Sequence, residues 1–358
     1  MASLYDPLAV GDLRLPNRVV MAPLTRARAG VERVPNALMA EYYRQRASAG
    51  LIISEATSVS PQGVGYADTP GIWSSAQIAG WRLVTDAVHQ VGGRMVLQLW
   101  HVGRISHPSF LNGAAPVAPS AIAPRGHVSL LRPPTPFVTP RALAIGELPG
   151  IIAAYRCGAE NAQRAGFDGV EIHGANGYLL DEFLQDSTNQ RSDDYGGPVE
   201  NRARLMLEAV DAAVSVWGPG RVGLHLAPRG DSHDMHDSDP LATFGYVARQ
   251  ARLRRLAFIC AREHTGAGRI GPHLKALFGG VYIGNEQFTG ESAGRALAAG
   301  EVDAVAFGRA FIANPDLPRR LRAGAPLNPA DTSTFYGSGP KGYTDYPALP
   351  AHAIGAGI

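Results

Sequence analysis

The most constraining feature of this chain is a regular alternation of short apolar runs with amphipathic stretches. The apolar runs predict strands at 19–22, 51–54, 95–99, 169–172, 222–226, 256–260, 281–283 and 304–307. The amphipathic stretches predict helices at 35–47, 77–90, 147–165, 198–216, 241–252, 272–278, 292–299 and 315–323. Strand–helix alternation is typical of a parallel sheet, because each parallel strand needs a crossover connection before the next.

Eight such units suit one closed (β/α)₈ barrel, the TIM barrel, better than two doubly wound domains. No linker rich in Pro, Gly or Ser divides the chain, so residues 1–358 are expected to form a single α/β domain. An insertion at 101–146 follows the third strand, and a tail follows the last helix. In such barrels the catalytic groups lie at the carboxyl ends of the strands and in the loops that follow them.

The amino-acid composition of the chain disfavours several classes of protein. Hydrophobic residues make up 45% of the 358 residues and the net charge is +2, which disfavours a disordered chain. With no long apolar run and no basic block, neither a membrane span nor a nucleic-acid partner is expected. Cys157 and Cys260 lack metal-ligand spacing and are predicted to be buried thiols, so no metal site is expected. The amino terminus shows no secretory pattern, which favours a cytoplasmic location.

Two polar residues of the first and third units suggest a bound ring. Thr25 follows the first predicted strand, where its hydroxyl can donate to a ring carbonyl; the alternative is a threonine that caps a turn. Gln98 lies on the third predicted strand, and its amide offers a donor beside an acceptor. That pair complements an imide edge, although a backbone partner would satisfy it equally well.

The fourth predicted strand opens into the most informative segment, H-G-A-N-G-Y at 173–178. His173 and Asn176 can both donate to one oxygen atom, and such donors stabilise negative charge that develops there. Tyr178 follows two residues later and can serve as a general acid. The alternative is a polar loop with a structural histidine, which three convergent groups make less attractive.

The last two predicted strands end in residues suited to an anion. Asn285 and Glu286 follow the seventh strand, and Gly308 and Arg309 follow the eighth. Loops at these two positions commonly bind phosphate in barrels, and an arginine can donate two hydrogen bonds to one phosphate. The sequence therefore predicts a phosphate site on this side of the barrel.

An ordered series of motifs resembles the Old Yellow Enzyme family of flavin-dependent ene-reductases. They are M-A-P-L-T-R at 21–26, S-E-A-T at 54–57, L-Q-L-W-H-V-G-R at 97–104, H-G-A-N-G-Y-L at 173–179, N-Q-R-S-D-D-Y-G-G at 189–197, D-A-V-A-F-G-R at 303–309, F-I-A-N-P-D-L at 311–317 and G-Y-T-D-Y-P at 342–347. They cover nearly the whole chain in the family's order. Thr25 matches the threonine-type branch, similar to bacterial N-ethylmaleimide reductase, rather than the branch with cysteine.

The resemblance implies noncovalent FMN at the barrel mouth, NAD(P)H as reductant and no metal. The cofactor-binding residues it implies are Pro23, Thr25, Ala56, Gln98, His225, Asn285, Glu286, Gly308 and Arg309. His173 and Asn176 would bind the substrate oxygen and Tyr178 would protonate the α-carbon, with Tyr66, Trp100 and Tyr336 around the substrate. The implied partners are activated alkenes: unsaturated aldehydes, ketones, imides and nitroalkenes. The expected protein is a monomer or a homodimer.

One residue departs from the family pattern. His225, on the fifth predicted strand, stands where the family has an arginine near flavin N1 and the C2 carbonyl. Period-2 alternation places Gly223, His225 and Ala227 on one face of that strand. Either His225 takes the site, or Arg229 reaches the flavin instead.

Two other functions remain open at this point. The first is a flavin-free barrel isomerase or lyase that acts on a phosphorylated metabolite through a lysine or carboxylate base. The chain has only two lysines, Lys275 in a helical pattern and Lys341 in the tail, which disfavours a Schiff-base lysine on a strand. The second is a flavin protein for storage or sensing, and the group at 173–178 argues against it.

Overall fold

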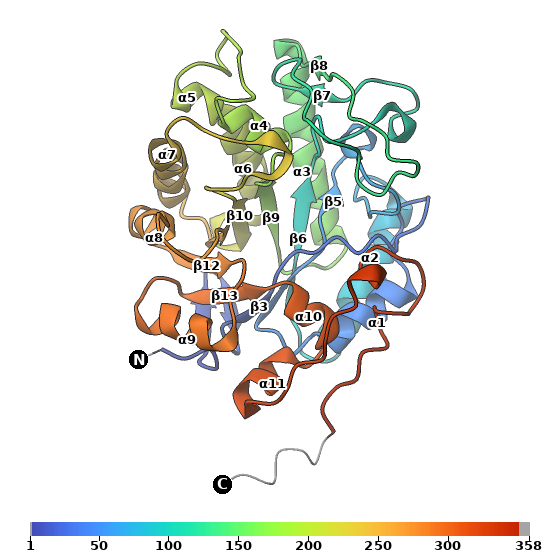
Figure 1. The fold of residues 1–358 in the computed structure, drawn as a ribbon, viewed down its shortest axis with the longest axis vertical. Coiled ribbons are helices and arrows are strands. Elements are labelled where there is room, and N and C mark those ends of the chain that lie inside the picture. Colours follow the sequence, from blue (N-terminus) through green and yellow to red (C-terminus); the bar gives the residue numbers. More distant parts are fainter. Residues whose placement is uncertain (1, 351–358) are drawn as a thin grey trace.

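A computed structural model describes residues 2–350 and contains the expected closed barrel as a single domain (Figure 1). Eight parallel strands pair in the order β4-β3-β13-β12-β11-β10-β9-β6, and β4 pairs with β6 to close the ring. Their bounds are β3 Val19–Met21, β4 Leu51–Ile53, β6 Met95–Trp100, β9 Gly169–Gly174, β10 Val222–Leu226, β11 Phe258–Arg262, β12 Val281–Asn285 and β13 Ala304–Phe307. The predicted α/β class and strand order along the chain are confirmed.

The helices lie outside this ring, between successive strands (Figure 1). Their bounds are α1 Ala37–Gln45, α2 Ser75–His89, α3 Leu148–Arg164, α4 Leu179–Leu184, α5 Val199–Arg202, α6 Arg204–Trp217, α7 Pro240–Leu253, α8 Gly271–Phe278, α9 Gly290–Ala298, α10 Arg309–Ala313 and α11 Leu317–Ala323. The predicted helix at 198–216 is divided into α5 and α6 at residue 203. The sequence did not predict α4, because its six residues span fewer than two helical turns, too few to display a helical period.

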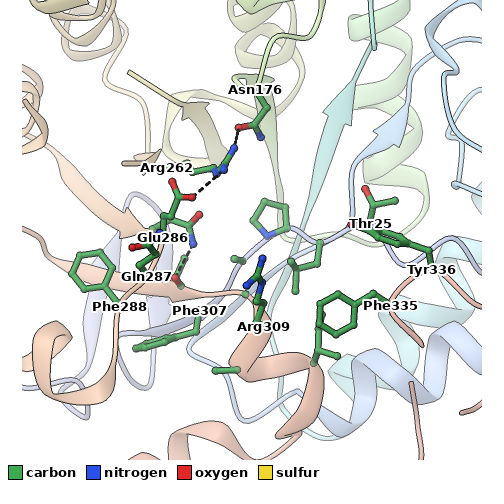
Figure 2. A pocket seen from close by; sticks show the side chains of 18 residues that line it. Thr25, Asn176, Arg262, Glu286, Gln287, Phe288, Phe307, Arg309, Phe335 and Tyr336 are labelled. Atoms are coloured by element: carbon green, nitrogen blue, oxygen red, sulfur yellow. Dashed lines mark hydrogen bonds and ion pairs between the residues drawn. The ribbon is translucent and has the colours of Figure 1, made fainter. Parts of the chain in front are cut away.

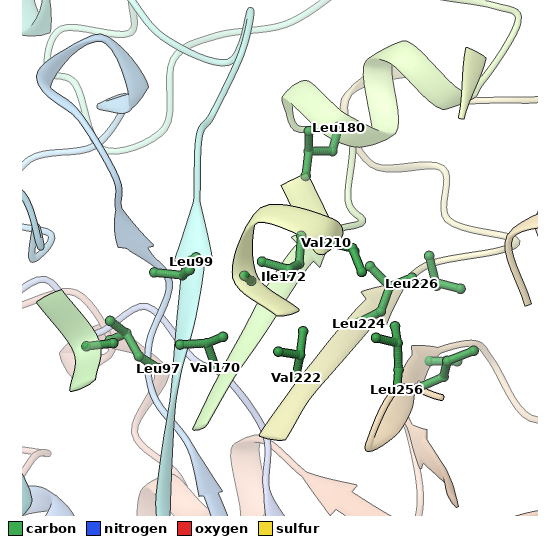
Figure 3. Packing of buried hydrophobic residues seen from close by; sticks show 14 of the residues in the cluster. Leu97, Leu99, Val170, Ile172, Leu180, Val210, Val222, Leu224, Leu226 and Leu256 are labelled. Atoms are coloured by element: carbon green, nitrogen blue, oxygen red, sulfur yellow. The ribbon is translucent and has the colours of Figure 1, made fainter. Parts of the chain in front are cut away.

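The barrel strands direct alternate side chains outward, into an apolar layer under the helices, and inward, where the layer is mostly apolar but includes polar side chains of β6, β9 and β10. Val222, Leu224 and Leu226 of β10 point outward into the layer under the helices, which Figure 3 shows with the matching residues of β6 and β9. Ile283 of β12 and Cys260 of β11 belong to the second layer, inside the barrel. The alternation predicted for 222–227 is therefore confirmed, and it directs His225 into the interior.

A short hairpin closes the amino end of the barrel. β1 (Leu8–Val10) and β2 (Leu13–Leu15) pair antiparallel, and their apolar side chains join the interior layer. That layer includes Leu51 and Ala304, the first residues of β4 and β13, so the hairpin covers this end. The sequence did not predict it, because three-residue strands carry almost no periodic signal.

Three details correct the sequence reading of the segments near the strand ends. β9 extends to Gly174, so His173 lies on the strand and not in the loop. β11 begins two residues later than expected and ends at Arg262. Cys157 is exposed on the outer face of α3, so only Cys260 is a buried thiol. Within residues 2–350, no helix combines the length and the apolar character that crossing a bilayer requires.

Short elements lie in and around the insertion at 101–146. β7 (Val117–Ala118) pairs with β8 (Arg141–Ala142), and β5 (Thr57–Ser58) pairs with the end of β6. Leu143 and Val117 anchor the insertion in the layer that contains α3. The insertion therefore covers the carboxyl end of the barrel beside β6 and β9.

A buried carboxyl group connects the barrel to the segment after β3. Glu55 is fully buried and accepts hydrogen bonds from the backbone nitrogen of Arg26 at 3.2 Å and from the Tyr43 hydroxyl at 3.3 Å. Burial nevertheless raises its pKa to about 7. The native state therefore retains a proton that the unfolded chain releases near pH 4.5, so stability falls as the pH rises through this window.

We expect Glu55→Gln to reveal this cost as a pH-dependent change in stability. The unaltered protein should lose stability between pH 5 and pH 8, whereas the glutamine of the variant stays neutral. The free energy of unfolding of the variant minus that of the unaltered protein should therefore increase by about 1–3 kcal/mol over this range. Urea unfolding curves at both pH values measure it. A difference that is constant across this range would contradict the raised pKa of Glu55.

Candidate active site

Two adjoining cavities open at the carboxyl ends of the barrel strands. The large cavity has a volume of about 580 Å³ and lies beside β12, β13 and α10 (Figure 2). The small cavity has a volume of about 110 Å³ and lies over β6, β9 and β10. The residues that line both cavities are Pro23, Thr25, Asn176, Arg262 and Asn285.

The structure brings nearly all of the predicted site residues to these cavities. Besides the shared residues, the predicted residues of the small cavity are Ala56, Gln98, Trp100, His173, Tyr178 and His225. Those of the large cavity are Glu286, Gly308, Arg309 and Tyr336. Tyr66 lines neither cavity but contacts Tyr178 directly. The side chain of Tyr336 is about half exposed, at the rim.

A hydrogen-bonded polar layer forms the floor of the small cavity. The Gln98 side-chain nitrogen donates to Glu171 Oε2 at 2.7 Å, and His225 Nδ1 lies 3.3 Å from Glu171 Oε1. All three side chains are buried. Among residues 2–350, no group hydrogen-bonds the side-chain oxygen Oε1 of Gln98 or the Thr25 hydroxyl, so both are available to a ligand.

His173 is held as a neutral imidazole above this layer. Burial, with His225 and Arg262 nearby, lowers its pKa well below the usual value near 6.5. Its Nδ1 is buried and has no partner among the described residues, and the same holds for Trp100 Nε1. An unpaired buried polar atom is costly, so these two atoms indicate that a polar ligand completes the site.

Aromatic rings form the wall of the small cavity. The hydroxyls of Tyr66 and Tyr178 are 2.9 Å apart, Tyr66 stacks on Trp100 at 5.4 Å, and Trp100 meets Tyr178 edge-on at 4.9 Å. Burial raises the pKa of Tyr66 to about 12 and that of Tyr178 well above 10. Both phenols therefore keep their protons at neutral pH, and Tyr178 has one to donate.

The large cavity carries the groups suited to an anion. Arg309 extends into it from the start of α10, beside Gly308, and has no hydrogen-bond or ion-pair partner within residues 2–350 (Figure 2). The Asn285 amide donates to the Ala306 carbonyl at 2.8 Å. The Glu286 carboxylate binds Arg262 at 2.9 Å, so only the backbone of Glu286 can serve an anion.

Arg262 is the functional residue that the sequence reading missed. It ends β11 and lines both cavities, where it contacts Asn176 at 2.8 Å. Its position in the sequence could have identified it, because a charged residue at the carboxyl end of a barrel strand is a candidate active-site residue. The expected strand end at 260 obscured it.

Arg229 does not reach the cavities. Its guanidinium donates to the carbonyl oxygens of Ala267 and His264, each at 2.9 Å, and pairs with Glu263 at 2.9 Å. These contacts keep it in the loops, and it lines neither cavity, which disfavours the alternative that Arg229 reaches the flavin. His225 occupies the cavity side of β10.

One cluster in the barrel interior has the composition of a metal site. The ligand atoms of Glu171, His225 and Cys260 lie within 4.8 Å of one another. However, Glu171 already accepts a hydrogen bond from Gln98, and burial raises the pKa of the Cys260 thiol well above 9. Metals bind the thiolate, so this arrangement favours a hydrogen-bonded layer over a metal centre.

The chain matches known flavin oxidoreductases over nearly its whole length. Residues 3–328 match the NADH:flavin oxidoreductase / NADH oxidase family. The flavin oxidoreductase hxnT of Emericella nidulans is 44% identical over 96% of this chain and 97% of its own. A probable flavin mononucleotide-dependent alkene reductase of Leishmania infantum is 44% identical over 97% of each chain.

Solved structures show the same fold over the whole length. The Old Yellow Enzyme homologue of Zymomonas mobilis superposes with a TM-score of 0.95 at 44% identity and covers 97% of this chain and 100% of its own. Morphinone reductase in complex with tetrahydroNAD gives a TM-score of 0.95 at 49% identity and covers 98% and 99% of the two chains.

We expect Arg309→Ala to weaken FMN binding through the phosphate alone. Loss of a charge-assisted hydrogen bond should raise the dissociation constant for FMN by about 10- to 100-fold. Riboflavin, which lacks the phosphate, should bind the variant and the unaltered apoprotein equally. Quenching of flavin fluorescence measures both constants, with Arg295→Ala on the exposed face of α9 as control. An equal loss for riboflavin would place Arg309 away from the phosphate.

Proposed function

The chain belongs to the NADH:flavin oxidoreductase / NADH oxidase family and to its Old Yellow Enzyme group, and on this premise we propose which alkenes it reduces and how. It is an FMN-dependent ene-reductase with a nicotinamide reductant. The proposed substrates are α,β-unsaturated aldehydes, ketones, imides and nitroalkenes. The observation that carries the proposal is the convergence of His173, Asn176 and Tyr178 on one small cavity.

The cavity residues suit FMN. Gln98 and Thr25 offer an unpaired carbonyl oxygen and an unpaired hydroxyl to the polar ring edge, and Arg309 offers its charge to the phosphate. Pro23, Ala56, Asn285, Glu286 and Gly308 are also among the lining residues. When bound, FMN supplies the hydride transfer from NAD(P)H to the β-carbon of the alkene.

His173 and Asn176 bind the oxygen of the activating group. His173 is neutral, so one ring nitrogen carries a proton that it can donate. The Asn176 amide oxygen is occupied by Arg262 at 2.8 Å, which leaves the amide nitrogen to donate. Two donors aimed at one oxygen stabilise the negative charge that accumulates there as the β-carbon is reduced.

Tyr178 completes the reaction by protonating the α-carbon. Its raised pKa keeps the phenol protonated until the carbanion develops, and its bond to the Tyr66 hydroxyl at 2.9 Å provides a route for replacing the proton. Proton donation by a positioned acid typically contributes about 10²- to 10⁴-fold.

The two other functions have less support. A flavin-free isomerase or lyase conflicts with the relatives, which are named for flavin chemistry over nearly the full chain length. A storage or sensor protein would not need two oxygen donors and a phenol around a separate cavity. NADPH consumption that depends on an added enone would distinguish the enzyme from the storage protein.

We expect Tyr178→Phe to separate the two chemical steps. The variant should retain FMN and undergo NADPH-driven flavin reduction, but it should reduce a cyclic enone about 10²-fold or more slowly. Nitroalkenes should lose much less, because their nitronate product can leave and be protonated in water. Stopped-flow traces of each half-reaction measure the effects. Equal losses on both substrates would contradict the proton-donor role of Tyr178.

A further inference from the structure

Arg262 joins three loops at the boundary of the two cavities, and Figure 2 shows its bonds to two of them, at Asn176 and Glu286. Its guanidinium donates to Asn176 Oδ1 at 2.8 Å, beyond the end of β9, and to Glu286 Oε1 at 2.9 Å, directly after β12. A third bond goes to the Ser232 hydroxyl at 3.1 Å, after β10. One side chain from β11 thus connects the loops that follow β9, β10 and β12.

The contact with Arg262 determines which end of the Asn176 amide faces the small cavity. A guanidinium has five donors and no acceptor, so only the amide oxygen can face it. The amide nitrogen must then face away from Arg262. Without this partner the oxygen and nitrogen ends could exchange by rotation, and the oxygen would then repel a negatively charged ligand.

Arg262 is itself held from the side of the large cavity. The Glu286 carboxylate fixes one terminal nitrogen, while Asn176 and Ser232 share the other. Asn176 has φ 60° and Glu286 has φ 88°, so both contact residues lie in the left-handed region. Residues other than glycine adopt this conformation at a cost, and such residues cluster at functional sites.

We propose that Arg262 is a positioning residue that orients the Asn176 amide as a donor toward the substrate oxygen, with Glu286 holding Arg262 in place. The inference rests on the proposed function, because it assumes that Asn176 binds that oxygen. It assigns the Glu286 side chain to the substrate site, although its backbone lies beside the phosphate site. Arg262 acts through Asn176 and not through its own charge.

A double-mutant cycle on phenolate binding tests this inference. A para-substituted phenol added to the oxidised, FMN-loaded protein should produce a long-wavelength charge-transfer band, and its titration gives a dissociation constant. Arg262→Leu and Asn176→Ala should each raise that constant by about 10-fold. The double variant should bind no more weakly than Asn176→Ala alone, because Arg262 has nothing left to orient.

The contrary result is additivity. If Arg262→Leu weakens binding by the same factor with and without Asn176, the guanidinium attracts the phenolate by its charge and the positioning role is wrong. Arg229→Leu is the matched control, since Arg229 lies in the preceding loop and lines neither cavity. It should leave the constant unchanged.

A second route avoids the loss of Arg262 itself. Glu286→Gln removes the charge that holds Arg262 but keeps the shape of the side chain. Introduced into the unaltered protein, it should weaken phenolate binding several-fold. Introduced into the Asn176→Ala variant, it should have no further effect. An effect that persists in Asn176→Ala contradicts the inference. If the unaltered protein gives no charge-transfer band, the proposed function fails, and the inference fails with it; a band with additive losses overturns the inference alone.

Discussion

Closure of the barrel is the constraint on which the site depends. The pairing of β4 with β6, at Ile52–Met95 and Ile53–Val96, joins the two ends of the strand order into a ring. Closure brings the carboxyl ends of β3, β6, β9 and β10 around one opening, although they lie up to about 200 residues apart in the chain. The outer apolar layer and the hairpin β1–β2 hold the ring, so the polar residues at its mouth need not stabilise the fold.

Burial sets the protonation states of the polar side chains at the mouth of the barrel. His173 is neutral and Tyr178 is protonated, because burial lowers the pKa of the imidazole and raises that of the phenol. Among the residues that line the two cavities, Arg262 and Arg309 are the only ones with a permanent positive charge. The neutral polar groups His173 and Tyr178 thus line the small cavity, whereas Arg309 lines the large one, and the proposed function assigns the first to the substrate and the second to the phosphate.

The sequence predicted the barrel well because its signal is repeated in every unit. Alternation along 222–227 placed His225 in the interior, and strand-end position led to His173, Asn176 and Arg309. The sequence did not reveal Arg262, because its importance depends on contacts with two other strands and on a strand end misplaced by two residues. Likewise α4 is too short to display a helical period, and no local pattern reports that the Tyr66 hydroxyl meets that of Tyr178.

The most direct measurement is an anaerobic titration that follows the absorption band of the bound flavin. Stoichiometric NADPH should bleach the band, and a cyclic enone added afterwards should restore it with one equivalent of saturated ketone formed. That result shows that the same bound flavin accepts hydride from NADPH and delivers it to the enone. A bleached flavin that only oxygen reoxidises, with the enone recovered unchanged, would contradict the assignment of the protein as an ene-reductase.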